Sequence, residues 1–462
     1  MRTLGKGMVG ATCVLSMAVL VAGCGTSSTG GAGDTTQVTK STQIDKKTGL
    51  PAYNGKATIT FWSWVPNDAK RVQIFEKYYP NIKVKLEDVG AGSPEYTKLS
   101  TAIQAKSGAP DVVMLEYDMM PQFIESGGLA DITQYVDPVK SKFPTWVMNQ
   151  VSSNGKVYAV PEDTGPLGLY YQKSIFDQEH LSVPTTWAQF QTEAEQFHQN
   201  NPNQAFSYFA TNDGQWQLGL LWAAGITPFQ QTSDGNWKIS LDSPQAVKVF
   251  QYWGNLIKSG AVEAVQPGTP SWEKEMDQGK FATVVGSAWY PSEDIVPWDK
   301  HASEHDWHAA FIPQWTAGQT VDGDWGGSAD AVTTQSKYPE AAAIFADFIN
   351  TSQYEQPHNV QPAGTGGGGL FPADKDGFSV PSFSAPDPSL GGQTANKDIF
   401  ETESSRVDAN WQWNPWSTYT FQELQSEVTN AVDGKESWQQ ALTNAQNKIV
   451  AYAKSQGYNV QG

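Results

Sequence analysis

Short runs of alternating and continuous apolar residues follow one another from residue 57 onward. Residues 57–64 alternate apolar with polar positions, so Ile59 and Phe61 share one face of an expected strand. In the segments between the strands, apolar residues recur at helical spacing. Strands are expected at residues 57–64, 82–86 and 109–115, and helices at residues 68–79 and 96–107. This order predicts an α/β layer with a largely parallel sheet.

The rest of the chain continues to mix helices and strands. Helices are expected at residues 186–197, 216–224, 244–259, 338–348, 419–433 and 438–456, and a strand at residues 279–286. Two β-like runs, residues 157–161 and 167–173, are separated by a kink that contains Pro and Gly. Such a pair is typical of a chain that crosses from one lobe to another.

Aromatic and acidic residues gather where the expected strands end. Ligands of parallel α/β sheets bind beyond the C-terminal ends of the strands. The residues at these ends are Trp62, Trp64, Asn67 and Asp68 after the first strand, and Glu116, Tyr117 and Asp118 after the third. The strand at 279–286 similarly leads to Trp289 and Tyr290. This combination predicts a polar ligand with a face that stacks on aromatic rings.

The N-terminus has the pattern of an export signal. Two basic residues precede an apolar run from Met8 to Ala22, which is short for a membrane span. The run ends Leu-Val-Ala-Gly-Cys24 and resembles the bacterial lipobox, in which the peptide is cut before the Cys and the thiol is lipidated. Residues 1–23 are therefore expected to be a lipoprotein signal peptide, and residues 24–55 a flexible tether. Cleavage would leave Cys24 as the only Cys, so no disulfide is expected.

The charge balance excludes several classes of partner. The chain has 30 Lys plus Arg against 48 Asp plus Glu, a formal charge of −18. A nucleic-acid-binding protein needs a basic surface, so that class is excluded. Arg occurs only at positions 2, 71 and 406, so arginine clamps for phosphate or carboxylate groups are scarce. Any attachment to a membrane is expected through the lipid and not through a basic patch.

A series of segments in a fixed order resembles a known family. The segments include Ile59-Thr-Phe-Trp-Ser-Trp64, Gly108-Ala-Pro-Asp111, Ser126-Gly-Gly-Leu-Ala-Asp131, Tyr158-Ala-Val-Pro161, Gly279-Lys-Phe-Ala282 and Gly326-Gly-Ser-Ala-Asp-Ala331. Together they resemble the extracellular solute-binding proteins of bacterial ABC importers, in the sugar-binding branch that includes maltose-binding proteins. The resemblance implies two α/β lobes of the type II periplasmic-binding-protein fold, with the ligand in the cleft between them. It places the first lobe at 57–164 plus 306–350 and the second at 165–305 plus 351–462.

The resemblance also implies which residues contact the ligand and which partners the protein has. The implied contacts are Trp62, Trp64, Asn67, Asp68, Glu116, Tyr117, Asp118, Glu162, Asp163, Asn212, Asp213, Trp216, Trp289, Tyr290, Trp325, Gly326 and Gly327. After the third strand this chain has Leu115 and Met119 where maltose-binding members have an aromatic–basic pair, which argues against maltose. The expected partners are a neutral sugar or oligosaccharide and the transmembrane permease. No cofactor, metal or nucleic acid is expected. The protein is expected to be a monomer on the outer face of the cell membrane.

The chemistry of these residues fits a sugar independently of the resemblance. The C–H face of a sugar ring packs on an aromatic plane, and its hydroxyls are satisfied by carboxylates and amides. Not every Trp need serve this purpose. Trp187, Trp253 and Trp438 lie in helical patterns and are expected in the core, whereas Trp411, Trp413 and Trp416 could line an extended groove.

Three alternatives remain beside the sugar receptor. The same carboxylates and Trp faces could hold a cationic solute such as a polyamine through cation–π contacts. A secreted glycosidase would also need two carboxylates, but the eight strand–helix repeats of a barrel hydrolase are missing from the sequence. His301, His305 and His308, with Glu304 and Asp306 between them, could bind a metal, although a solvated loop is the favoured interpretation.

Overall fold

The strands expected at the start of the body form one mixed sheet. In the computed structural model its order is β2-β1-β3-β14-β6, where β1 is Ala57–Trp62, β2 Ile82–Glu87, β3 Val112–Glu116, β14 Ser328–Val332 and β6 Ala159–Pro161. β1 pairs in parallel with both β2 and β3, as the strand–helix alternation predicts. β14 runs antiparallel to β3 and β6 and so brings a distant segment into the sheet. Ile59 and Phe61 are fully buried on one face of β1, as their alternation predicts.

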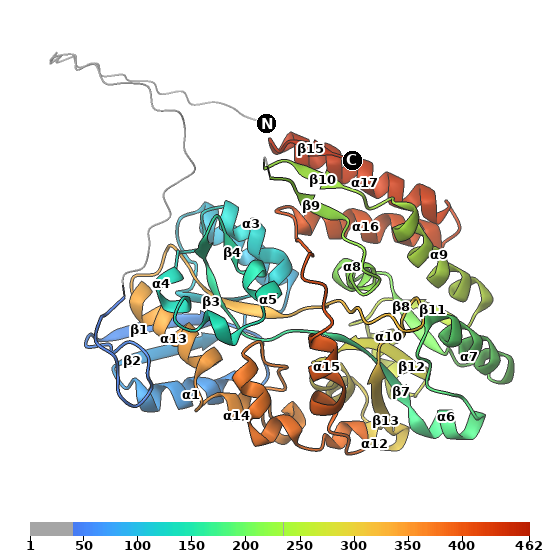
Figure 1. Cartoon of the computed structure of the whole chain (residues 1–462), viewed down its shortest axis with the longest axis horizontal. Coiled ribbons are helices and arrows are strands. Elements are labelled where there is room, and N and C mark those ends of the chain that lie inside the picture. Colours follow the sequence, from blue (N-terminus) through green and yellow to red (C-terminus); the bar gives the residue numbers. More distant parts are fainter. Residues whose placement is uncertain (1–39, 234) are drawn as a thin grey trace, which may run out of the picture. The chain divides into compact units, whose positions relative to one another are not determined.

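The helices of this first lobe cover the sheet with aromatic side chains. α1 (Asp68–Tyr78) and α13 (Pro339–Thr351) pack together, and Phe345 meets the rings of Phe61 and Phe75 edge-on at 5.0 and 4.9 Å. Such aromatic pairs add to the stability gained by burial. Figure 1 shows α1 and α13 beside β1 and β2. The other helices of this lobe are α2 (Ser93–Gln104), α3 (Met120–Glu125), α4 (Thr133–Val136) and α5 (Thr145–Gln150).

The second lobe contains a separate antiparallel sheet. Its order is β12-β7-β13, with β7 at Leu167–Gln172, β12 at Thr283–Ser287 and β13 at Trp307–Phe311. β8 (Ser207–Ala210) and β11 (Val262–Val265) form a parallel pair beside it. Because β13 is hydrogen-bonded to β7, the predicted lobe boundary at residue 306 is wrong. The chain returns to the first lobe only between β13 and β14.

Long helices complete the second lobe, and most begin or end where sequence signals predict. They are α6 (Lys173–Glu179), α7 (Trp187–Asn200), α8 (Gly214–Trp222), α9 (Pro244–Ser259), α10 (Pro270–Asp277), α16 (Ser417–Val432) and α17 (Trp438–Ser455). The side chain of Ser243 caps α9 by accepting from the N–H of Ala246, and Gly260 ends this helix in the left-handed region. β9 (Phe229–Gln231), β10 (Trp237–Ile239) and β15 (Val460–Gln461) form a small sheet nearby.

Three segments connect the two lobes and lie against each other. Residues 162–166 pair with 324–325 through an isolated bridge between Pro166 and Asp324 and a hydrogen bond from Trp325 N to Gly165 O of 2.9 Å. The third segment joins them through a bridge between Asp163 and Pro372. The remaining short α-helices are α11 (Val296–Trp298), α12 (Ala302–His305), α14 (Gln356–Asn359) and α15 (Glu401–Ser404).

The structure describes residues 40–233 and 235–462. The predicted signal peptide, Cys24 and the first part of the tether lie outside these residues. Residues 40–55, predicted as tether, instead pack on the first lobe: the Tyr79 hydroxyl donates to Pro51 O at 3.1 Å and lies 2.9 Å from Thr48 Oγ1. The Tyr354 hydroxyl also donates to Lys47 O at 3.0 Å. None of the helices in the described part of the chain is long and apolar enough to span a membrane.

Candidate functional site

Three tryptophans keep part of their surface exposed where the strands of both lobes end. Trp64, just past β1, packs edge-on against Tyr96 with ring centroids 6.1 Å apart. Trp289 follows β12, and its ring lies 4.6 Å from that of Trp325 in the connecting segment. The Trp289 indole N–H donates to the carbonyl of Trp325 at 2.9 Å, which fixes the two rings relative to each other. Partly exposed aromatic planes of this kind are suited to stacking.

Gly326 and Gly327 allow this close approach of rings and backbone. Both have positive φ, 79° and 72°, a conformation that other residues rarely adopt. A Cβ on Gly326 would lie 2.8 Å from the Trp289 indole nitrogen, and one on Gly327 would lie 2.8 Å from the Tyr117 ring. The two glycines therefore shape the site, although neither has a side chain that could bind a ligand.

Five carboxylates from both lobes lie near these aromatic residues, because Glu116 bonds Tyr96, the ring neighbour of Trp64, and Asp213 bonds Trp325. We call them the carboxylate cluster: Glu116, Asp118, Asp213, Glu293 and Asp294. Burial, followed by the charges of Glu116 and Asp213, raises the pKa of Asp118 well above its usual range. Asp118 belongs to the first lobe and Asp213 to the second, so the cluster spans the lobes.

The second-lobe members of the cluster interact with each other and with Asp68. Burial and then the charge of Asp68, in the first lobe, raise the pKa of Glu293 to about 7. Burial raises the pKa of Asp213 to about 6, although the Trp216 N–H that this carboxylate caps lowers it. The pKa of Asp294 is raised well above normal by burial, Glu293 and Asp213. Like charges from opposite lobes thus face one another.

Two of the expected site carboxylates are held in a buried ion-pair network. Arg71 is fully buried and pairs with Glu162 and, at 3.0 Å, with Asp68. Burial lowers the pKa of Arg71, but the adjacent Glu162 and Asp68 raise it above its usual value on balance. Glu162 also accepts from Ser328 Oγ at 2.9 Å. The Glu162 side chain is fully enclosed by protein atoms. In this structure Glu162 therefore has a structural role at the first crossover, in place of the predicted ligand contact.

Other expected contacts lie behind the site. Asp163 accepts from the N–H of Ser328 at 2.8 Å, and burial raises its pKa to about 7. Buried aromatic residues whose polar atoms bond to protein are Trp62 (to Glu87), Tyr117 (to Asp163 O), Trp216 (to Val285 O) and Tyr290 (to the Tyr208 hydroxyl). This corrects the prediction of direct contact for these residues: they support the residues that line the site.

The two expected Asn contacts are exposed and tied to backbone carbonyls. Asn67 has φ of 63°, and its amide donates to Gly367 O at 2.7 Å. Asn212 donates to Pro267 O at 3.0 Å. The bond of Asn67 connects the loop between β1 and α1 to the segment that contains Gly367, whereas Asn212 is bound within the second lobe.

Sequence reasoning missed Glu293, Asp294 and Tyr96. The Tyr96 hydroxyl donates to Glu116 at 2.5 Å, so Tyr96 positions one member of the carboxylate cluster. Glu293 and Asp294 lie in a π-helical turn, Pro291–Ile295, directly after Trp289 and Tyr290. Their position four and five residues after Trp289 was an available signal, because a helical turn there returns them to the same side.

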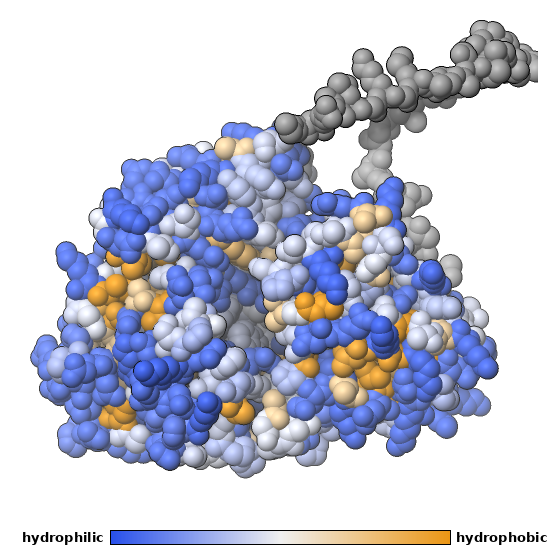
Figure 2. Space-filling model, turned by 180° about the vertical axis from the view of Figure 1, so that it is seen from behind, coloured by the Kyte–Doolittle hydropathy of each residue, from blue (hydrophilic) through white to orange (hydrophobic). Residues whose placement is uncertain are grey.

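A groove of about 580 Å³ is lined in part by Tyr96, whose ring packs against Trp64. It lies between α2 and α3 of the first lobe and α16 and α17 of the second, and its lining includes Tyr96, Trp416, Tyr419, Tyr452 and Tyr458. Of the tryptophans proposed for an extended groove, Trp416 lines it, whereas Trp411 is buried in a stack with Trp222. Seen from behind, the surface is hollowed near the middle of the view (Figure 2).

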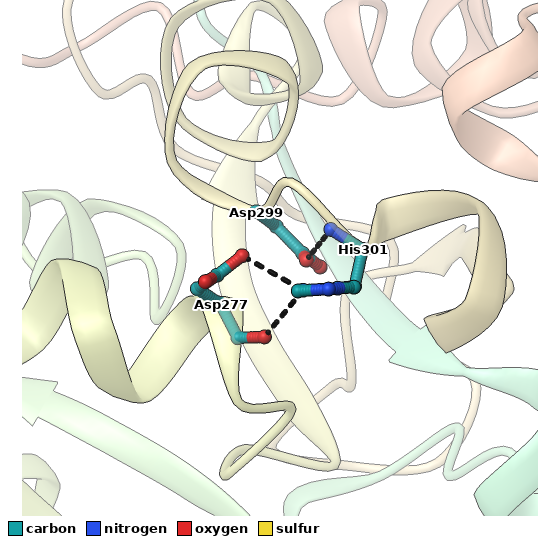
Figure 3. Close-up of side chains that lie close together, drawn as sticks. All are labelled: Asp277, Asp299 and His301. Carbon is teal, nitrogen blue, oxygen red and sulfur yellow. Dashed lines mark hydrogen bonds and ion pairs between the residues drawn. The ribbon is translucent and has the colours of Figure 1, made fainter.

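The histidine segment does not gather its three histidines. Asp277, Asp299 and His301 come together instead, with candidate ligand atoms within 4.8 Å of one another (Figure 3). His301 Nδ1 lies 3.0 Å from Asp277 Oδ1, and Asp299 accepts from the His301 N–H at 3.0 Å. Asp299 also bonds the indole of Trp307 at 2.7 Å. These side chains satisfy one another, and the expected solvated loop is a pair of short helices fastened by the buried Asp299.

Comparisons with known proteins agree with this architecture. Residues 55–356, well over half of the chain, match the family model described as bacterial extracellular solute-binding protein. An arabinooligosaccharide-binding protein from Halalkalibacterium halodurans is 23% identical over 65% of this chain and 68% of its own length. Its counterpart from Bacillus subtilis is 25% identical over 65% of this chain and 70% of its own length.

A solved structure extends the likeness over most of the chain. The ABC transporter associated binding protein from B. animalis subsp. lactis Bl-04, in complex with beta-1,6-galactobiose, aligns with a TM-score of 0.78 and 27% identity. The alignment covers 88% of this chain and all of that one. It confirms the periplasmic-binding-protein fold that the sequence predicts. Since proteins of this family bind solutes without converting them, the glycosidase alternative is set aside, and the chain belongs to the bacterial extracellular solute-binding proteins.

Proposed function

We propose that this chain is the substrate-binding protein of an ABC importer and captures a sugar or oligosaccharide between its two lobes. The observation that carries the proposal is the arrangement of Trp64, Trp289 and Trp325 beside carboxylates from opposite lobes. The aromatic planes would bury the C–H faces of sugar rings, and Asp118 and Asp213 would accept from hydroxyls. The relatives named for arabinooligosaccharide and galactobiose support a saccharide as the ligand class.

The position of the ligand suggests how it would favour closure. A ligand that contacts both lobes binds the closed form better than the open form, and it shifts the population by that difference in affinity. The crossover segments near residues 162–166 and 324–327 would serve as the hinge. The closed protein would then dock on the transmembrane permease as a monomer, and the permease would contact both of its lobes.

Sugar binding is tested by Trp289→Ala, with the exposed Trp298→Ala as a matched control. The panel contains arabino-oligosaccharides, β-1,6-galactobiose, lactose, maltodextrins and spermidine, and binding is measured by calorimetry. Loss of the stacking plane is expected to weaken saccharide binding by about tenfold or more. The control is expected to bind normally. Unchanged affinity of Trp289→Ala would remove this residue from the site, and binding of spermidine alone would overturn the sugar assignment.

The lipid anchor is a separate proposal based on the lipobox. A diacyl group on Cys24 would hold the protein stably at the outer face of the membrane, near its permease. Mass spectrometry of the mature N-terminus is expected to find cleavage before Cys24 and a diacylglyceryl adduct. The Cys24→Ala variant is expected in the medium or as uncleaved precursor. An unmodified Cys24 in membrane-associated protein would contradict the proposal.

A further inference from the structure

The carboxylate cluster is not balanced by positive charge. Within the described residues, Glu293 and Asp294 make no hydrogen bond or ion pair through their side chains, and no Lys or Arg pairs with any cluster member. Of the arginines in this part of the chain, Arg71 is buried among Glu162 and Asp68, and Arg406 pairs with Glu403. The negative charge around the aromatic residues is thus left open to a ligand.

Asp118 provides a second, independent sign that a ligand group belongs here. Its side chain is only 2% exposed, and its Oδ1 has no hydrogen-bond partner. A buried carboxylate oxygen without a partner is costly, because it has lost water and gained nothing in exchange. The Asp118 carboxylate also lies close enough to Glu116, and to Asp213 of the other lobe, for their charges to interact. A donor from a bound molecule would satisfy Asp118 in the closed protein.

The kind of donor can be inferred from the charge of the whole cluster. A neutral hydroxyl gives one carboxylate a hydrogen bond but leaves the repulsion among the others unchanged. A protonated amine gives the hydrogen bond and attracts every neighbouring carboxylate, and this attraction is strong where water is excluded. The partly exposed faces of Trp289 and Trp325 would attract the same cation. The cluster therefore favours a positively charged ligand group over a neutral one.

A flexible polyamine would satisfy the charges but would not use the stacking planes fully. Trp64 belongs to the first lobe, Trp289 to the second and Trp325 to the connecting segment, so partly exposed rings come from both lobes. We propose that the site selects an amino saccharide, whose rings stack on these tryptophans while its protonated amine is held by Asp118 and attracted by the other carboxylates of the cluster. This rests on the proposed function and narrows its ligand from sugars in general to sugars with a free amine.

The test compares disaccharides whose nitrogen is a protonated amine in one member of a pair and an uncharged acetamide in the other. Chitobiose with free amines and N,N′-diacetylchitobiose form one pair, and the corresponding galactosamine disaccharides form another. The full chain is titrated by calorimetry at about pH 7, where an aliphatic amine is protonated and more of the cluster is ionised than at lower pH. The amine form is expected to bind at least about tenfold more tightly than its acetylated partner. Raising the salt concentration is expected to reduce this preference.

Variants identify the source of the preference. Asp118→Asn and Asp294→Asn remove one charge each without changing shape, and each is expected to reduce the preference for the amine. Asp433→Asn is the matched control, since Asp433 is exposed and pairs with Lys435 at 2.9 Å at the C-terminal end of α16. It is expected to keep the preference. Removal of the repulsion in the cluster should not impair folding, which a melting curve of each variant checks.

The outcomes separate this inference from the proposed function. Equal or tighter binding of the acetylated form overturns the amine preference but leaves a sugar receptor. The inference is also overturned if the protein prefers the amine form but neither salt nor the two Asn variants reduce that preference. The carboxylate cluster would then not be the origin of the preference. Binding of spermidine without any saccharide, or binding of no saccharide in either form across both pairs and the neutral panel, overturns the inference and the proposed function together.

Discussion

Trp216 and Trp289 illustrate how residues of one type take different roles in this protein. Trp216 lies on α8, every residue of which is buried, and its indole donates to Val285 O at 2.9 Å. Its ring packs edge-on against Phe209 at 5.3 Å. Trp289 follows a strand end and remains partly exposed beside Trp325. The first is a core residue and the second is available to a ligand.

The core role of Trp216 predicts a large loss of stability on truncation. Trp216→Ala removes a fully buried ring and leaves a cavity and an unpaired Val285 carbonyl, so the free energy of unfolding should fall by about 3–5 kcal/mol. Denaturation in urea measures the change. Trp298→Ala, at an exposed position, should alter stability by less than about 0.5 kcal/mol. Wild-type stability of Trp216→Ala would show that the ring is not part of the packed core.

Elements with strong local signals were predictable from the sequence. The helix expected at 244–259 coincides with α9, and Thr186 caps α7 as its sequence position indicates. The boundaries are set by neighbours along the chain: a capping side chain at one end and a glycine at the other. The helix expected at 216–224 was found at Gly214–Trp222 but is buried on all sides, so periodicity could not reveal which of its faces meets the ligand.

Features that depend on distant pairing could not be predicted in the same way. β13 joins β7 although 135 positions separate Trp307 from Gln172, and no local pattern specifies that partner. Similarly, Arg71 binds Glu162, which is 91 residues away in the sequence. Glu162, an expected ligand contact, therefore belongs to a buried ion-pair network. The strand-end rule brings candidate residues of both lobes together, and their contact with a ligand stays a prediction; burial decides which residues at those ends remain exposed.

Contacts between α3 and the C-terminal part of the chain hold the lobes together at the groove. The Tyr458 hydroxyl donates to Glu125, and Thr418 Oγ1 donates to Gln122 at 3.2 Å. Both contacts join α3 of the first lobe to segments of the second. If the lobes open and close around a ligand, these bonds stabilise the closed form.

Tyr458→Phe should therefore weaken ligand binding without altering Trp64, Trp289 or Trp325. Loss of one interlobe hydrogen bond lowers the closed fraction, so the apparent affinity should fall by about two- to tenfold. Small-angle scattering of the free protein should show a larger radius of gyration. Tyr419→Phe is the control, because the Tyr419 hydroxyl bonds to Glu423 within the same helix. Equal effects of the two substitutions would contradict a specific interlobe role for Tyr458.

Across the whole molecule, buried carboxyl groups make stability depend on pH in an unusual direction. Burial raises the pKa of Glu95 to about 8, of Asp163 to about 7 and of Asp213 to about 6. In the unfolded chain such groups titrate near about pH 4. Between these values the folded protein binds more protons than the unfolded chain, so the free energy of unfolding falls as the pH rises. The melting temperature should be higher at about pH 5 than at about pH 8.

Glu95 gives the sharpest test of this dependence. Its side chain is fully buried, neither carboxylate oxygen has a partner, and the charges of Asp88 and Glu116 add to the effect of burial on its pKa. Ionisation of this group at about pH 8 should cost on the order of a few kcal/mol. Glu95→Gln replaces it with a neutral side chain of the same shape. The variant should melt roughly a few degrees higher than the wild type at about pH 8 and close to it at about pH 5.

The comparison of the two pH values separates ionisation from packing. A substitution that merely repacked α2 would shift the melting temperature equally at both, whereas removal of a titrating group shifts it only where that group is charged. Glu195→Gln, on the exposed face of α7, removes the same charge without relieving a buried one and should leave the pH profile unchanged. A Glu95→Gln profile parallel to that of the wild type would mean that Glu95 titrates normally, and the fall in stability would then have to originate in Asp163 and the carboxylate cluster.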